Sequence, residues 1–165
     1  MSVSGLSERE IDNFIRNYVD RGMNVGGKFA LAEPKLEKMR RVKYPFSPKE
    51  TAKVIVEHAK KSPVGLVTYK QIWEVFRPGA IWIGNAPRSE MAKVLAAVIV
   101  YCVDNKLPIL STLVVRANPR NHSEKAIVNI YNEAKSLGLE AGSDAHLFVK
   151  NQQDIALNLT HDMLG

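Results

Sequence analysis

The segment 67–115 constrains the fold most, because its helix and strand signals follow one another in a fixed order. Thr68 and Gln71 have the spacing of a Thr-x-x-Gln capping box, which opens a helix that Pro78-Gly79 stops. A longer helix is expected at about residues 88–105, and the apolar, β-rich residues 107–115 predict a strand covered on both faces. The inward-facing positions are predicted to be Ile72, Val75 and Phe76 in the first helix and Met91, Leu95, Val98, Ile99 and Cys102 in the second. The order indicates a mostly helical α/β fold, with a helix-turn-helix-like (winged-helix-like) pair backed by a small sheet.

Further helices are marked by capping residues, at Ser7, Ser47 and Ser123. The first is predicted over residues 7–21. Residues 35–43 are rich in Lys and Arg and form either a short helix or an extended arm. A short strand at residues 146–149 is expected to precede a last amphipathic helix at residues 151–163.

The length of 165 residues, with 45% hydrophobic residues, suits one compact core and is short for two. We expect a single domain over residues 1–165, with an N-terminal helix and loop (7–34), a basic core (35–120) and C-terminal helices (121–165). No apolar run approaches the ~18 residues of a membrane span, and no secretory signal precedes the first helix. The sequence therefore predicts a cytoplasmic protein.

Positive charge is concentrated in the middle of the chain. The net charge of +6 divides into −1 over residues 1–34, +10 over residues 35–125 and −3 over residues 126–165. This distribution is expected if the central region faces a polyanion such as nucleic acid. A solvated lysine-rich surface would give the same distribution, and the sequence does not separate the two interpretations.

No group of residues in the sequence identifies a reaction. The four histidines are scattered, and no pair has the three- or four-residue spacing that directs two rings at one metal from a helix. His146 has Asp144 as a possible partner, either on the surface or in a site. Cys102 is expected to be a small core residue rather than a reactive thiol, because no charged group at predictable spacing would lower its pKa. We expect no catalytic residue, no metal and no cofactor.

Three short motifs carry a family resemblance: Val67-Thr-Tyr-Lys-Gln-Ile72, Met91-Ala-Lys-Val-Leu95, and Asn105-Lys-Leu-Pro-Ile-Leu110 followed by Leu113-Val-Val115. Together they resemble the C-terminal winged-helix-like domain of methylguanine-DNA methyltransferases and alkyltransferase-like proteins, over about residues 45–118. The resemblance implies a DNA-binding recognition helix. It matches Tyr69 to the family's tyrosine and Asn105 to its asparagine, and it puts Arg88 one residue before the family's arginine position, which Ser89 occupies.

The chain departs from this family at the reactive centre. Where the family has Pro-Cys-His-Arg, this chain has Ser111-Thr-Leu-Val114, so the nucleophilic cysteine needed for alkyl transfer is missing. The turn between the two helices is also longer than the three or four residues of an ordinary helix-turn-helix, and it contains Trp82. The resemblance therefore favours binding over chemistry.

The resulting hypothesis is non-catalytic nucleic-acid binding, with duplex DNA favoured over RNA. Arg88 and Lys93 are expected to point toward a groove, and Tyr69 and Trp82 to contact a base. The residues expected to hold phosphates are Lys70, Arg116 and Arg120, with Arg40 and Arg41 as an additional arm. For Tyr69 and Trp82 the alternative is a role as packed core aromatics, which the sequence favours over base contact.

A second hypothesis belongs to another functional class. A small basic protein without catalytic residues can act by occupying another protein, for example as a phage or mobile-element inhibitor of a host defence complex. The anchor in that case would be the apolar loop Ala80-Ile-Trp-Ile83. An exposed Trp82 without DNA affinity would favour this hypothesis.

Overall fold

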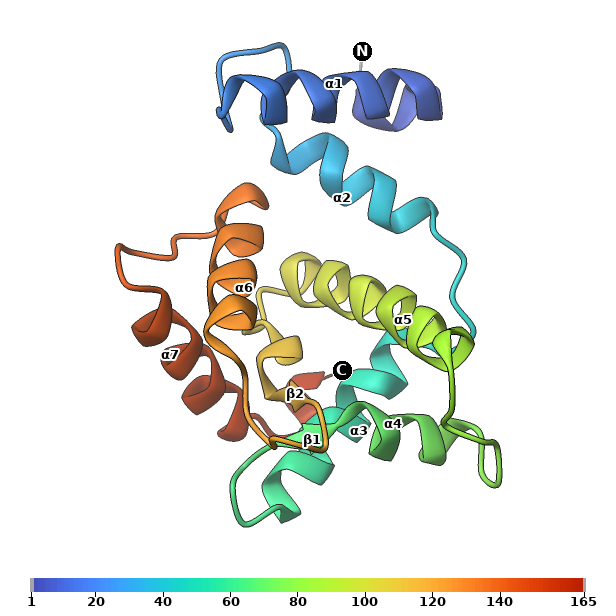
Figure 1. The fold of residues 1–165 in the computed structure, drawn as a ribbon. Helices are drawn as coiled ribbons and strands as arrows, with labels where there is room; N and C mark the ends of the chain where they lie inside the picture. The colour runs from blue at the N-terminus through green and yellow to red at the C-terminus, as the bar shows by residue number, and fades with distance from the viewer. Residues whose placement is uncertain (1, 165) are drawn as a thin grey trace.

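The computed structural model describes residues 2–164, which form a mostly helical α/β fold with one small parallel sheet (Figure 1). The α-helices are α1 (Glu8–Arg21), α2 (Ala32–Arg41), α3 (Pro48–Lys61), α4 (Tyr69–Phe76), α5 (Asn85–Asp104), α6 (Glu124–Ser136) and α7 (Ala145–Leu157). The strands are β1 (Val67–Thr68) and β2 (Val114–Val115), and the 3-10 helices are η1 (Val3–Gly5), η2 (Leu110–Leu113) and η3 (His161–Leu164). In the sheet, Val67 lies opposite Val114 and Thr68 opposite Val115. The predicted mostly helical α/β class is confirmed.

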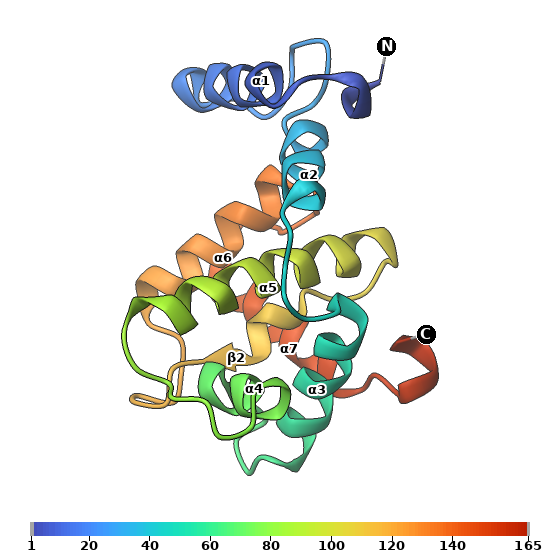
Figure 2. The ribbon, with the colours of Figure 1, turned by 90° about the vertical axis from the view of Figure 1, so that its right-hand side faces the viewer.

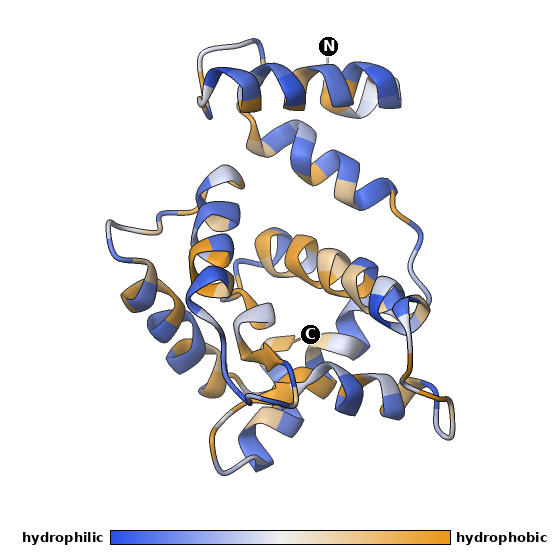
Figure 3. Ribbon diagram, in the orientation of Figure 1, coloured by the Kyte–Doolittle hydropathy of each residue, from blue (hydrophilic) through white to orange (hydrophobic). Residues whose placement is uncertain are grey.

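Helix α5 runs through the core, with α2, α3, α4 and η2 packed around it (Figure 2). Its contributions to the main buried cluster are Met91, Val94, Leu95, Val98 and Cys102. Figure 3 shows hydrophobic residues along most of α5, whereas α1 and α2 carry many hydrophilic residues on their outer faces. A helix that is covered on several sides needs apolar residues on more than one face, so α5 lacks the one-sided pattern of a surface helix.

Capping residues start the helices where the sequence predicts them. The Ser7 hydroxyl accepts the Glu10 backbone N–H at 3.3 Å, and the Glu10 carboxylate accepts the Ser7 N–H at 2.8 Å. Thr68 and Gln71 form the equivalent pair at 3.2 Å and 2.8 Å. Because this second box turns the chain directly from β1 into α4, Tyr69 is the first helical residue beside the sheet.

The strand predicted over residues 107–115 is wrong for most of its length. The chain forms η2 at Leu110–Leu113, and only Val114–Val115 is a strand. The Thr112 hydroxyl donates to the Ile109 carbonyl at 2.7 Å, and the Gln153 amide donates to the Thr112 carbonyl at 2.9 Å. These bonds give the buried polar groups of the turn the partners that a sheet would otherwise supply. A run of apolar residues fits either a buried turn or a buried strand, so the sequence does not distinguish them.

The predicted strand at residues 146–149 is also wrong, because these residues form the first turn of α7. The Asp144 carboxylate accepts the Leu147 backbone N–H at 3.0 Å, so Asp144 caps the helix. Helix α7 then ends at Leu157, and η3 follows in place of the remainder of the predicted 151–163 helix.

Helix α5 begins at Asn85, three residues before the predicted start at residue 88. Gly84 is its N-cap residue, with φ 83° and ψ −166°, and Pro87 sits in the first turn. Proline is tolerated there because the first N–H groups of a helix have no partner within the helix. Three predicted inward positions also differ: Val75 is 42% exposed, and Phe76 and Ile99 are half-buried.

Helices α1 and α2 form a separate layer above α5 and α6 (Figure 2). A small cluster of Val3, Leu6, Ile11 and Phe29 packs α1 against η1 and the loop before α2. It joins the rest of the molecule through ion pairs from Lys35 to Glu133 and from Arg40 to Asp104, each at 2.6 Å. Helix α2 includes most of the basic segment 35–43, so this segment is a helix rather than an extended arm. Its ion pairs attach it to the body of the protein.

Candidate functional site

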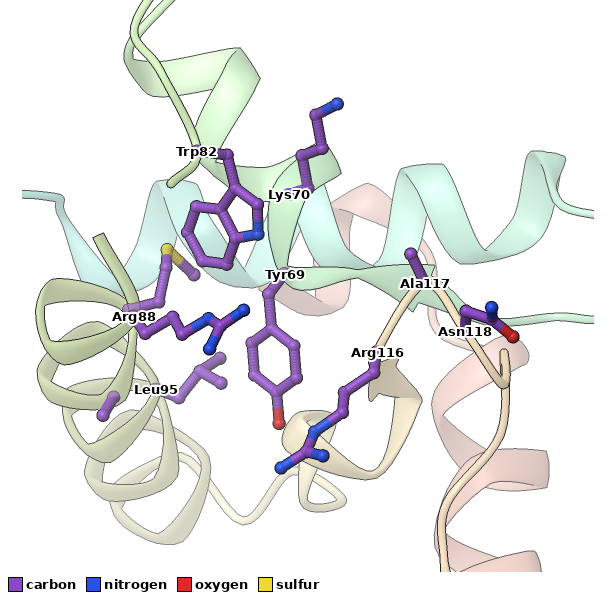
Figure 4. A pocket seen from close by; sticks show the side chains of 10 residues that line it. Tyr69, Lys70, Trp82, Arg88, Leu95, Arg116, Ala117 and Asn118 are labelled. Carbon is purple, nitrogen blue, oxygen red and sulfur yellow. The ribbon is translucent and has the colours of Figure 1, made fainter. Parts of the chain in front are cut away.

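A recess of about 610 Å³ lies where the starts of α4 and α5 meet the segment after β2 (Figure 4). It is lined by Tyr69, Lys70, Trp82, Arg88, Met91, Ala92, Leu95, Arg116, Ala117 and Asn118, and we call it the α4–α5 cavity. The sheet accounts for its position. Since Thr68 pairs with Val115, the next residues along each strand, Tyr69 and Arg116, become neighbours.

The α4–α5 cavity is cationic. Lys70, Arg88 and Arg116 line it, and none of the described residues that form its walls is acidic. Arg88 and Arg116 form no ion pair with a residue of the described chain, whereas Lys70 is 3.7 Å from Glu74. An exposed ion pair of this kind contributes less than about 1 kcal/mol, so Lys70 can leave Glu74 for a ligand. The guanidinium groups of Arg88 and Arg116 are therefore available to an anionic ligand.

Tyr69 contributes an apolar ring and a neutral hydroxyl to the cavity wall. Burial raises the pKa of Tyr69, and the Arg116 guanidinium opposes part of that shift. The phenol therefore stays protonated at physiological pH and can both donate and accept a hydrogen bond. Figure 4 shows its hydroxyl end beside the Arg116 side chain, where it faces the same space as the guanidinium.

Trp82 reaches the cavity from the loop between α4 and α5. Its ring is 5.6 Å from that of Trp73 and tilted by 57°, so one side of the indole packs on the core. Figure 4 shows the indole above the Arg88 side chain, and Trp82 lines the cavity. Both Trp82 and Tyr69 thus pack on the core, and both also line the recess. Contact of these rings with a base stays a prediction.

The loop 77–84 is anchored by a pair that the sequence analysis missed. Arg77 lies over the rings of Phe46 and Trp73, at 5.4 Å and 5.3 Å from the centroids. Its guanidinium is also 3.3 Å from the Glu90 carboxylate. Arg77 follows α4 and Glu90 lies in the second turn of α5, so the pair closes the base of the loop. No sequence signal indicates it, because the intervening loop has no regular period.

Four predicted contact residues lie outside the cavity. Lys93 is exposed on α5, five residues from Arg88 and therefore about 140° around the helix. Arg120 donates to the Leu66 carbonyl at 3.1 Å. Arg40 is paired with Asp104, and Arg41 is 2.8 Å from Glu37 and 3.1 Å from the Ser4 carbonyl. The cavity brings together Tyr69, Lys70, Trp82, Arg88 and Arg116.

The groups considered for other chemistry have structural partners. Burial raises the pKa of the Cys102 thiol to about 12, as expected for a core residue. His146 is 2.8 Å from Glu124, not paired with Asp144, which caps α7. Over residues 2–164, no three His, Cys, Asp or Glu side chains gather where they could hold a metal ion. In the same residues, no helix has the length and apolar character to cross a membrane.

Comparison of the chain with protein-family models, with known proteins and with solved structures finds no match. The side chains of the α4–α5 cavity and the elements that hold them are therefore the basis for assigning a function.

Proposed function

We propose that this protein binds nucleic acid without catalysing a reaction, and that the α4–α5 cavity and its rim form the contact surface. The observation that supports this most is the combination of two half-exposed aromatic rings with Arg88 and Arg116, which have no acidic partner among residues 2–164. Phosphates attract the guanidinium groups, and bases offer flat surfaces for aromatic contact. Lys70 lies on the same rim and adds a third cation.

In this proposal, α4 and α5 act as a helix-turn-helix-like pair backed by the β1–β2 sheet. The resemblance to the methyltransferase domain supports this role, because it matches Tyr69 to the family's tyrosine and α5 to the family's recognition helix, with Arg88 one residue before the family's arginine position. Helix α5 would present Arg88 to a duplex groove from its first turns. A helix-in-groove arrangement favours duplex DNA, since the deep major groove of RNA does not admit a helix.

The arrangement predicts which residues matter and which do not. Arg88, Arg116 and Lys70 would neutralise phosphates, while Tyr69 would donate its hydroxyl to a phosphate or a base edge. Arg40, Arg41 and Arg120 already hold protein groups, so their main role would be structural.

A salt titration tests the proposal. Binding of a fluorescent DNA duplex is measured by anisotropy at several salt concentrations, beside single-stranded DNA and duplex RNA. Three phosphate contacts predict a slope of about −2.7 for log K against log salt. Absence of binding even at low salt, or affinity that does not change with salt, would contradict the proposal.

A further inference from the structure

Two isoleucines in the loop between α4 and α5 are the most exposed of the large hydrophobic side chains described. Ile81 is 71% exposed and Ile83 is 78% exposed, whereas Trp82 between them packs on Trp73. The loop stands out from the body of the molecule beside the ends of α4 and α5 (Figure 1). Nothing in the described chain covers these two side chains, so their burial requires a partner.

The loop is held in shape although its tip is exposed. The Arg77–Glu90 pair closes its base at 3.3 Å, and the Ala80 N–H donates to the Arg77 carbonyl at 3.1 Å. Trp82 fixes the middle of the loop against the core. Ile81 and Ile83 are therefore displayed on a pre-organised support, which reduces the entropy lost when a partner covers them.

The surroundings of the loop indicate the chemistry of the partner. Trp82 lines the α4–α5 cavity together with Arg88 and Lys70, and the two isoleucines are its neighbours in the sequence, so the same loop carries exposed apolar side chains and one wall of a cationic cavity. A partner that fits must offer negative charge and apolar surface within a short distance of each other. In a DNA duplex, phosphates border the groove and the apolar faces of stacked bases lie behind them.

We propose that Ile81 and Ile83 form a wedge that inserts at a base step and unstacks it while the cavity cations hold the flanking phosphates. This inference rests on the proposed function and extends it from binding to DNA deformation. Apolar side chains that enter a groove commonly open base steps and bend the duplex. Flexible pyrimidine–purine steps are the expected targets, because they are the easiest to unstack.

The test uses duplexes that contain 2-aminopurine, whose fluorescence rises when it is unstacked. The wild-type protein should raise this signal at a TA or CA step, and the Ile81→Ser/Ile83→Ser variant should abolish the rise. The variant should keep the salt slope of the wild type, because the phosphate contacts remain. Val19→Ser/Val25→Ser is the matched control, since these side chains are 66% and 64% exposed in the α1 region, away from the cavity, and it should behave as wild type.

The outcomes separate the wedge from the proposed function. Salt-dependent binding without a fluorescence rise, or a rise that the Ile81→Ser/Ile83→Ser variant retains, overturns the wedge and leaves DNA binding standing. If the wild-type protein binds none of the nucleic acids, both the wedge and the proposed function are overturned. A parallel experiment with vesicles of anionic lipid tests the alternative partner, a membrane, which also has an anionic surface over an apolar interior. Vesicle binding that depends on the two isoleucines, with no unstacking of DNA, would assign the loop to a membrane and overturn the wedge.

Discussion

Cys102 provides a quantitative test of the core, because the same burial that makes it unreactive makes the protein sensitive to alkali. The thiol lies in the main buried cluster, and burial raises its pKa from 9.0 to about 12. The folded protein therefore holds this proton more tightly than the unfolded chain does. Stability from this group is fully present below pH 9 and is lost as the pH rises toward 12.

The size of the effect follows from the two pKa values. At pH 8 the thiol is almost fully protonated in both states, so its ionisation leaves the unfolding free energy nearly unchanged. At pH 10.5 the unfolded thiol is ionised while the folded thiol is not, which destabilises the fold by about 2 kcal/mol. Cys102→Ala removes this ionisation. It also lowers stability at every pH, but that offset cancels when the two pH values are compared.

The assay is urea unfolding of the wild type and of Cys102→Ala at pH 8 and at pH 10.5, followed by far-UV circular dichroism. The wild type should lose about 2 kcal/mol more than the variant between the two pH values. Burial also raises the pKa of Tyr69, so both proteins share a further loss above pH 10. The pKa of Tyr101 is raised by burial and also by the charge of Cys102, and Cys102→Ala removes the second cause. Equal losses in the two proteins, or rapid reaction of the native thiol with a soluble reagent at pH 7, would refute the buried-core assignment.

Two further predictions concern the elements that support the cavity. Gly84→Ala should lower stability by about 1–3 kcal/mol in a thermal melt, because φ 83° and ψ −166° strain any residue with a Cβ; Gly5→Ala, at a position without a positive φ, should have little effect. Thr68→Ala should cost about 1 kcal/mol and weaken DNA binding, because it removes the cap that places Tyr69, whereas Ser123→Ala should cost a similar amount and leave DNA binding unchanged. Equal stability of the two glycine variants, or equal DNA affinity of the two cap variants, would contradict these assignments.

The helix starts could be predicted because capping is local. Ser7, Ser47, Thr68 and Ser123 each cap the helix that follows, through an oxygen that accepts a backbone N–H three residues ahead. Asp144 follows the same rule, and the strand prediction at residues 146–149 failed because that cap was overlooked. The 107–115 segment failed for another reason. Its form depends on two hydrogen bonds with α7, which no local pattern contains: the Ile109 N–H donates to the Gln152 side-chain oxygen, and the Gln153 amide donates to the Thr112 carbonyl.

The candidate site was predicted in part for a similar reason. Tyr69 and Lys70 follow β1 and Arg116 follows β2, so the pairing of two short strands brings these three residues together. Arg88 and Trp82 complete the cavity from α5 and from the loop before it. Lys93 was included because it lies on the same helix as Arg88, but it faces another direction. Charge alone did not distinguish cations that are free from those already paired, such as Arg40 with Asp104. The Arg77–Glu90 pair depends on the path of a loop, and its residues carry no periodic signal.

The most direct test of the central claim compares two double variants that remove the same charge. Arg88→Ala/Arg116→Ala takes two cations from the α4–α5 cavity, and Arg16→Ala/Arg21→Ala takes two exposed arginines from α1, at the other end of the molecule (Figure 1). Both are titrated with a DNA duplex across a salt series. The cavity variant should reduce the steepness of the salt slope by about two, from about −2.7 to about −0.9, whereas the α1 variant should keep the wild-type slope. Equal slopes for the two variants would show that the cavity is not the site that binds DNA.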